Sequence, residues 1–206
     1  MTGRTELLPG LDVSRETRER LEAFAADLLK WTARINLIAP GTAEDVWHRH
    51  ILDSAQLYCL APESFSHWSD LGAGGGLPGL VIAVLAAELN PTARITLVES
   101  DQRKATFLRQ AARALSLTPT IHAARVESLP PLEADVVSAR ALKPLAELLP
   151  LVTRHLSPTG RAILPKGRRA EEELAAAPGW HFDLTRSQSK TDPDATLLTL
   201  ERITRG

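Results

Sequence analysis

The fold class of this chain is decided by the stretch Asp70-Leu71-Gly72-Ala73-Gly74-Gly75-Gly76-Leu77-Pro78-Gly79. It follows a run that begins at His67 and precedes a second apolar run, Leu80 to Leu89. Glycines at such a junction allow a sharp turn from strand to helix. They also let the backbone approach a ligand, with the first N–H groups of the helix facing it. Five glycines in eight residues exceed what a plain turn needs, so the segment predicts a ligand-binding loop.

Segments typical of strands and of helices alternate from residue 67 onward. Strands are predicted at 67–71, 94–99, 119–123, 134–139 and 161–165, with helices near 78–89, 101–116, 144–155 and 168–177. This alternation predicts a parallel sheet with helices on both faces. Two further strand-like runs, 180–186 and 195–202, have no helix between them and should pair antiparallel. The expected fold is therefore α/β, a Rossmann-like and mostly parallel sheet with an antiparallel C-terminal hairpin.

The first sixty residues have a different pattern, which predicts helices. Ser14 can cap a helix whose apolar residues recur at helical spacing to about Trp31. Thr42 and Asp45 form a weak capping box for a second helix, to about Leu60. We therefore expect two parts, an N-terminal helical extension at 1–62 and a Rossmann-like domain at 63–206.

The composition is that of an ordinary globular protein. The 206 residues include 24 Lys and Arg against 25 Asp and Glu, with 44% hydrophobic residues, which excludes low-complexity disorder, collagen and a disulfide scaffold. The single cysteine, Cys59, favours a reducing compartment, and we expect a cytoplasmic location. No apolar run approaches the roughly 20 residues that cross a bilayer, so no membrane partner is expected. The net charge of -1 disfavours broad nucleic-acid binding.

The glycine-rich loop alone leaves the choice of ligand open. Gly74, Gly76 and Gly79 satisfy the dinucleotide spacing G-x-G-x-x-G, and Glu99 follows 20 residues after Gly79. An acid at that place can bind the ribose of any adenosine cofactor. Asp70 favours a cationic ligand over a pyrophosphate, and S-adenosylmethionine carries a sulfonium and an amino group. A methyltransferase cofactor is therefore preferred, with a dinucleotide as the alternative.

Other enzyme classes lack their characteristic residues. The chain contains no phosphate-binding G-x-x-x-x-G-K-[ST] loop and no G-x-S-x-G esterase motif. One cysteine and six scattered histidines do not predict a zinc site, and no metal site is expected. Tyr58 lacks the lysine four residues later that a short-chain dehydrogenase would use. A group transfer from an activated cofactor would need none of these groups.

With these residues in hand, the chain resembles the bacterial small-subunit ribosomal RNA methyltransferase G family, also called GidB. The resemblance extends from about Leu28 to about Leu200. It rests on the order and spacing of several blocks, which are Trp31…Asn36-Leu37, His50-Ile51-Leu52-Asp53-Ser54, the glycine-rich loop, Arg125-Val126-Glu127, Ser138-Ala139-Arg140-Ala141 and Lys166-Gly167. The resemblance implies a seven-stranded class I methyltransferase fold. It also implies methyl transfer from S-adenosylmethionine to N7 of a guanine in the decoding region of 16S rRNA.

The resemblance also implies roles for single residues. Gly72 and Leu77 would border the methionine and ribose of the cofactor, and Val126 and Glu127 would meet its adenine. The expected cofactor-binding residues are Asp70, Gly72, Gly74, Gly76, Leu77, Glu99, Val126, Glu127 and Arg140. The expected catalytic residues are Arg140, His50 and Asp53, of which the last two lie three apart and can share one helical face.

The implied reaction needs orientation more than acid–base chemistry, because guanine N7 carries a free lone pair at neutral pH. Arg140 could donate to guanine O6 or to a phosphate. The expected RNA-binding residues are Asn36, Arg103, Lys104, Lys166 and Arg168, and the partner would be 16S rRNA or the 30S subunit, met by a monomer. Residues 161–170 carry four basic and no acidic side chains, whereas 1–66 have seven basic and ten acidic ones. The near-neutral total therefore hides a basic segment.

Three rival interpretations stay open. They are a class I methyltransferase with another substrate, a dinucleotide oxidoreductase, and a non-catalytic ribosome-assembly factor that keeps the pocket.

Overall fold

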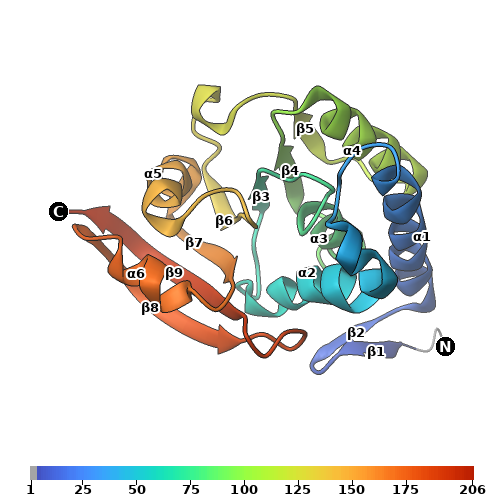
Figure 1. The fold of residues 1–206 in the computed structure, drawn as a ribbon, viewed down its shortest axis with the longest axis horizontal. Coiled ribbons are helices and arrows are strands. Elements are labelled where there is room, and N and C mark those ends of the chain that lie inside the picture. Colours follow the sequence, from blue (N-terminus) through green and yellow to red (C-terminus); the bar gives the residue numbers. More distant parts are fainter. Residues whose placement is uncertain (1–3) are drawn as a thin grey trace.

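A seven-stranded sheet is the centre of the structure, a computed structural model that describes residues 4–206. The strand order is β5-β4-β3-β6-β7-β9-β8, and Figure 1 shows these strands running from the C-terminal hairpin to β5. The strands are β3 (His67–Leu71), β4 (Arg94–Val98), β5 (Thr120–His122), β6 (Ala134–Ser138), β7 (Leu156–Lys166), β8 (Trp180–Gln188) and β9 (Thr196–Arg205). The strands β3 to β7 are parallel to one another, whereas β9 pairs antiparallel with both β7 and β8. The predicted α/β fold and its antiparallel hairpin are confirmed.

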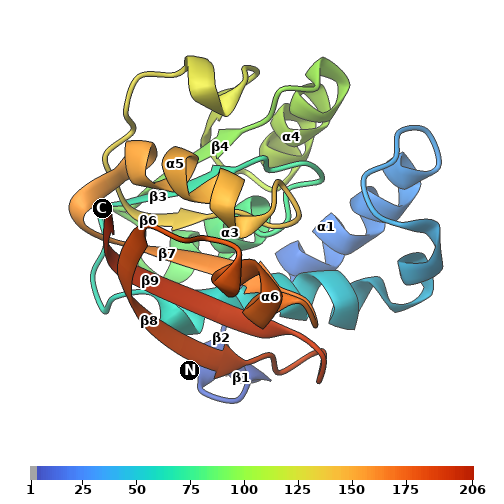
Figure 2. The same ribbon diagram turned by 60° about the vertical axis from the view of Figure 1, so that its left-hand side comes forward.

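Helices cover both faces of the sheet because the strand side chains alternate between two apolar cores. Val136 and Ile163 belong to one core, while Val137 and Leu164 belong to the other. On the first face lie α3 (Gly79–Leu89) and α4 (Gln102–Ala114), and on the second lie α5 (Leu145–His155) and α6 (Ala170–Ala175). Figure 2 shows α5 and α6 beside the β7, β8 and β9 end of the sheet.

The first helix, α1 (Arg15–Thr32), forms as its cap and apolar spacing predict. The Ser14 hydroxyl accepts a hydrogen bond from the Thr17 N–H at 3.2 Å, and Leu21, Phe24 and Leu28 are buried in the same core as α3. The helix therefore adds a layer outside the first face of the sheet, as Figure 1 shows at the right. The division at residue 62 stays a prediction.

The predicted helix to Leu60 is wrong in its form. The chain there makes short pieces of different pitch, namely a 3-10 turn η1 (Pro40–Asp45), a π-helical turn η2 (Trp47–Leu52), α2 (Asp53–Ala55) and a second 3-10 turn η3 (Gln56–Leu60). Capping and apolar spacing do not distinguish a 3-10, an α- and a π-helix. Their backbone hydrogen bonds span three, four and five residues, and the sequence patterns of such similar turns are nearly the same. Such π-turns frequently occur at functional sites, and this one carries His50.

A small hairpin of β1 (Thr5–Leu8) and β2 (Leu11–Val13) precedes α1 and was not predicted. Leu8 and Val13 are buried, so the hairpin adds to the core of the first face. Both backbone and side chain of Ser14 donate to the Glu88 carboxylate, which connects the end of the hairpin to α3. Residues 1–3 of the expected helical extension lie outside the described residues.

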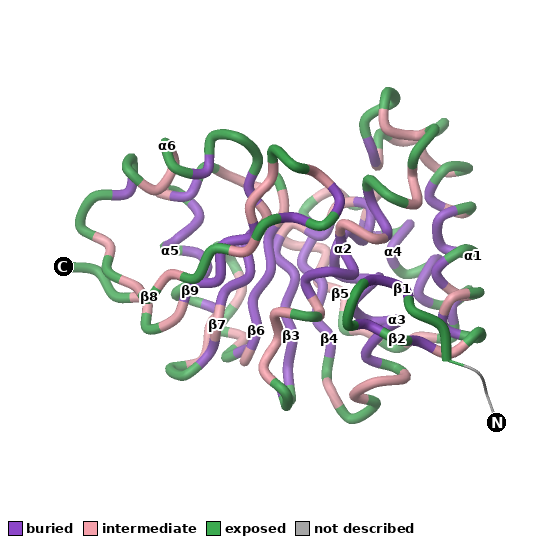
Figure 3. The backbone as a smooth tube through the Cα atoms, turned by 90° about the horizontal axis from the view of Figure 1, so that it is seen from below, coloured by how far each residue is buried: buried purple, intermediate pink, exposed green. Residues whose placement is uncertain are grey.

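Burial is greatest along the middle strands, as Figure 3 shows for β6, β3 and β4. All five residues of β3 are buried, which fits a strand covered on both faces. Among residues 4–206, no helix has both the length and the apolar character needed to span a membrane.

Candidate functional site

A cleft of about 380 Å³ opens where β3, β4 and β6 end. The carboxyl ends of parallel strands meet at this edge, and ligands of α/β proteins bind there, at the point where strand order reverses. Its walls come from the glycine-rich loop after β3, Glu99 and Ser100 after β4, the segment 124–127 after β5, and the segment 140–143 after β6. Seven of the nine predicted cofactor residues line it, namely Gly72, Gly74, Leu77, Glu99, Val126, Glu127 and Arg140.

Gly72 occupies a position where a side chain would collide with the wall of the cleft. Its φ is +74°, and a Cβ built there would lie 2.7 Å from Cδ1 of Leu142, another residue of the cleft wall. Its N–H donates to the Val98 carbonyl at 2.8 Å, so the loop stays against the end of β4. The glycine therefore holds the cleft open, as close approach of a ligand to the backbone requires.

Glu99 is fixed by backbone donors on both of its carboxylate oxygens. Oε2 accepts from the Gly74 N–H at 2.8 Å, and Oε1 accepts from the Asp101 N–H at 2.7 Å. The side chain is largely buried yet lines the cleft. Its remaining lone pairs can accept hydroxyl groups of a ligand, as the predicted ribose contact requires.

The structure places Asp70, a predicted cofactor residue, outside the lining of the cleft. Its carboxylate is buried beneath the loop, where it accepts from the Gly79 N–H at 2.9 Å and from the Ser138 hydroxyl at 2.7 Å. Burial raises the pKa of Asp70 to about 6. Gly76 is also absent from the lining of the cleft, and its N–H donates to the Ala73 carbonyl at 2.7 Å. Both residues make hydrogen bonds inside the glycine-rich loop. The spacing of the motif alone cannot distinguish such a residue from one that contacts a ligand.

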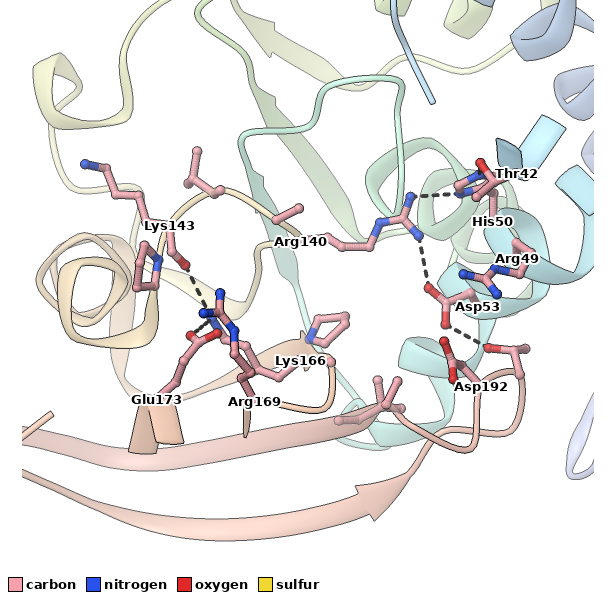
Figure 4. Close-up of a pocket in the computed structure, with 18 residues that line it drawn as sticks. Thr42, Arg49, His50, Asp53, Arg140, Lys143, Lys166, Arg169, Glu173 and Asp192 are labelled. Carbon is pink, nitrogen blue, oxygen red and sulfur yellow. Dashed lines mark hydrogen bonds and ion pairs between the residues drawn. The ribbon is translucent and has the colours of Figure 1, made fainter. Parts of the chain in front are cut away.

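A second cavity of about 530 Å³ adjoins the cleft. The two share the wall formed by Arg140, Ala141, Leu142 and Lys143. Figure 4 shows the second cavity, with His50 and Asp53 on one side and Lys166, Arg169 and Glu173 on the other. A group bound in the second cavity would therefore lie next to a ligand in the first.

Arg140 is the centre of a hydrogen-bonded set that includes the two other predicted catalytic residues. Nη1 donates to Oδ2 of Asp53 at 3.0 Å, and Nη2 donates to Nδ1 of His50 at 3.1 Å. Nε2 of His50 lies 2.7 Å from the Thr42 hydroxyl. The structure therefore brings together Arg140, His50 and Asp53, as predicted, across the boundary of the two cavities (Figure 4).

His50 is neutral in this arrangement. An arginine can only donate, so Nδ1 must be an acceptor and Nε2 must carry the proton, which it donates to Thr42. Burial and the neighbouring Arg140 charge lower the pKa of His50 to about 4, against a smaller opposing effect of Asp53. A neutral imidazole leaves the arginine and the aspartate as the charged pair of the site.

Two residues of the site were missed, because nothing in the local sequence marks them. Gln56 and Thr191 both donate to Oδ1 of Asp53, at 2.9 Å and 2.8 Å. Thr191 comes from the loop between β8 and β9, and it lies 138 residues from Asp53 in the chain. Only the antiparallel hairpin brings this loop to the site end of the sheet.

Three of the predicted RNA-binding residues lie together. Asn36, Arg103 and Lys104 line a hollow of about 320 Å³ with Arg34, between the end of α1 and the start of α4. Lys104 also borders the cleft. This hollow, which we call the α1–α4 hollow, also contains Asp101 and shares Lys104 with the candidate cofactor site.

The other two predicted RNA-binding residues differ from each other. The Lys166 ammonium is 2.7 Å from Glu173 and also donates to the Lys143 carbonyl, and its side chain is only 8% exposed. Its charge is therefore neutralised inside the second cavity, so Lys166 does not form part of an exposed basic surface. Arg168 is 81% exposed, 3.5 Å from Asp194. Arg161 is also neutralised, since it pairs with Glu201 near the middle of β7.

Metal-ligating side chains do not converge in the part of the chain that the structure describes. Among residues 4–206, no group of three or more His, Cys, Asp or Glu side chains is placed to hold an ion.

Comparison with known proteins identifies the family. The family described as "GidB: rRNA small subunit methyltransferase G" matches residues 17–190. A curated protein of Cereibacter sphaeroides named "Ribosomal RNA small subunit methyltransferase G" is 53% identical over 94% of this chain and 93% of its own length. The chain belongs to the rRNA small subunit methyltransferase G family. A relative of the same name from a Ruegeria species is 47% identical over 95% of each chain.

Among solved structures, the family member resembles class I methyltransferases. The O-methyltransferase TomG of Streptomyces achromogenes, solved with S-adenosylmethionine, matches with a TM-score of 0.57 and 17% identity over 89% of each chain. At this identity the likeness shows the fold alone. The chain thus has the class I methyltransferase fold.

Proposed function

We propose that this protein transfers a methyl group from S-adenosylmethionine to N7 of a guanine in 16S ribosomal RNA of the small subunit. Family membership supports the reaction and the RNA. The observation that carries the proposal is that two cavities share one wall at Arg140. A methyl donor in one and a nucleotide in the other would meet at that wall, as a direct transfer requires.

The residues of the cleft fit S-adenosylmethionine, which when bound supplies a methyl group on a positively charged sulfur. The cavity volume of about 380 Å³ lies within the range of small-molecule sites. Gly72 removes the side chain that would block the donor, and Glu99 presents acceptors for ribose hydroxyls. Val126 and Glu127, at the same rim, would recognise the adenine through a backbone N–H and a carboxylate.

The second cavity would hold the guanine, and the chain's own residues would orient it. Arg140 has five N–H donors, of which Asp53 and His50 take two. The remaining donors can reach guanine O6, the standard partner of arginine, or an RNA phosphate. A donor at O6 would hold the neighbouring N7 toward the cleft, and no base is needed because N7 has no proton to lose. Catalysis would then rest on proximity and on the fixed charges of Arg140 and Asp53.

The basic side chains of the α1–α4 hollow would bind the RNA backbone near the target. Arg34, Arg103 and Lys104 line this hollow, and Lys104 also lines the cleft. Phosphate contacts position a single-stranded or looped RNA without reading its sequence. The proposed partner is therefore 16S rRNA or the 30S subunit, bound by one copy of the chain.

The test is transfer of labelled methyl groups to naked 16S rRNA, 30S subunits and 70S ribosomes, followed by mapping of the modified base. We expect one N7-methylated guanine, and Arg140→Ala should reduce kcat at least a hundredfold while the protein stays folded. Arg186→Ala, on β8 and paired with Glu171, is the matched control that should keep activity. Methylation of another substrate alone would favour a different class I methyltransferase. Transfer to none of the RNAs, with rRNA still bound, would favour an assembly factor.

A further inference from the structure

Gln56 is an amide buried between the N-terminal extension and the C-terminal hairpin. Its side-chain oxygen accepts from the backbone N–H of Lys190 at 2.8 Å. Only an oxygen can accept that hydrogen bond, so the orientation of the amide is determined. Its nitrogen must then face the other way, where it donates to Oδ1 of Asp53 at 2.9 Å and to the Ser189 hydroxyl at 3.0 Å.

Thr191 gives Asp53 a second donor on the same oxygen. Its hydroxyl lies 2.8 Å from Oδ1 of Asp53, and its backbone N–H donates to the Ser189 hydroxyl at 3.2 Å. Gln56, Ser189 and Thr191 are all buried. Oδ1 of Asp53 is therefore saturated by neutral donors, and Oδ2 alone is left for Arg140.

We propose that Gln56 and Thr191 are positioning residues, which fix the Asp53 carboxylate and thereby hold the Arg140 guanidinium at the boundary of the two cavities. This inference rests on the proposed function. Neither residue needs to touch cofactor or RNA through its amide or hydroxyl, because those groups are already used on Asp53 and the loop. The C-terminal hairpin thus takes part in the site through the loop 189–191.

The physical reason is that a carboxylate bound by one arginine can rotate about its last torsion. Terminal carboxylate torsions are broad, and an arginine that follows such a partner samples several positions. Two donors on one oxygen define the plane of the Asp53 carboxylate, and hence the line along which Nη1 of Arg140 donates. A displacement of about 1 Å at a reacting centre can cost two orders of magnitude in rate.

The decisive variant is Thr191→Val, which keeps the shape of the side chain and removes the donor. Gln56→Met is the second, since it keeps the length and removes the amide. Thr191→Ser restores a hydroxyl and should restore the function. Thr185→Val makes the same chemical change on an exposed position of β8, and it serves as the matched control.

Two measurements separate positioning from a merely structural role. The first is kcat and the KM for S-adenosylmethionine in methyl transfer to 30S subunits. The second is the pKa of His50 by NMR titration, which needs no activity, because Arg140 donates to this ring and helps to keep its pKa low.

We expect Thr191→Val and Gln56→Met each to lower kcat about tenfold with little change in KM, and to raise the pKa of His50. The double variant should lose less than the product of the two losses, because both residues act on one carboxylate. Unchanged kcat and unchanged His50 titration in folded variants would overturn the inference. A lower kcat with an unchanged His50 pKa would overturn it too, as a structural effect. If the unmodified protein methylates no RNA, the proposed function fails, while the His50 titration still decides whether the two residues position Arg140.

Discussion

Arg140 donates a hydrogen bond at 3.0 Å to Asp53, which lies 87 residues earlier in the chain. The arginine follows β6 at the carboxyl edge of the sheet, and the aspartate begins α2, in the segment that precedes β3. The pair therefore connects the central sheet to the segment that precedes β3 in the chain. Both side chains are about one-fifth exposed, so their attraction is only partly screened.

Replacing the aspartate should damage both stability and transfer. Asp53→Asn removes the charge that balances Arg140, and breaking such a partly buried pair should lower the free energy of unfolding by about 2 kcal/mol. Methyl transfer should fall at least tenfold. Denaturant unfolding and the transfer assay measure the two effects. Asp45→Asn, in an exposed turn, is the matched control, and equal losses in both variants would contradict a special role of the pair.

The histidine of the site should make stability depend on pH. Its pKa is about 4 in the folded protein, below the ordinary value of 6.5, so between these values the unfolded chain binds more protons. Its contribution to stability is therefore complete above about pH 6.5 and is lost as pH falls toward 4. Melting temperatures between pH 4 and 7 check this. His50→Asn keeps an acceptor for Arg140 but cannot titrate, and its melting curve should be flatter; an equally steep curve would assign the effect elsewhere.

A methyl group on the glycine-rich loop should weaken cofactor binding. In Gly72→Ala the new Cβ meets Leu142 across the cleft, at a φ of +74°. The dissociation constant for S-adenosylmethionine, measured by calorimetry, should rise at least tenfold. Gly179→Ala has a similar φ of +76° but free space around the Cβ, so it incurs the backbone strain of about 1 kcal/mol without the obstruction. Equal cofactor affinity in the two variants would show that the Leu142 side chain moves aside and that the added Cβ does not hinder binding.

The basic side chains of the α1–α4 hollow should determine the salt dependence of RNA binding. Arg34→Ala combined with Arg103→Ala should weaken binding to 16S rRNA and reduce the slope of log affinity against log salt by about 0.7 per lost phosphate contact. Fluorescence anisotropy across a salt series measures this, and S-adenosylmethionine affinity should stay the same. Arg15→Ala, which pairs with Glu16 and Glu19 on α1, should change neither quantity. An unchanged slope in the double variant would place the RNA elsewhere.

The sheet and the loop could be predicted because their signals are local. Each of these signals depends on residues close in sequence: the glycines from Gly72 to Gly79, the alternation of strands and helices, and the two strands within 180–202 that have no helix between them. His50, Asp53 and Arg140 could be named as well, and the structure brings them together. Their mutual distances could not be derived, since His50 lies on a π-turn that resembles an α-helix in sequence.

The sequence by itself determined which elements form and which side chains end near the carboxyl edge of the sheet. Only the tertiary structure decided the direction in which each polar group points. Asp70 turns inward to Gly79 and Ser138, whereas Glu99 borders the cleft. Lys166 is neutralised by Glu173, and Gln56 meets the loop at Thr191. The reason is physical: a polar side chain takes the hydrogen-bond partner that burial leaves it, and that partner often lies far away in the chain.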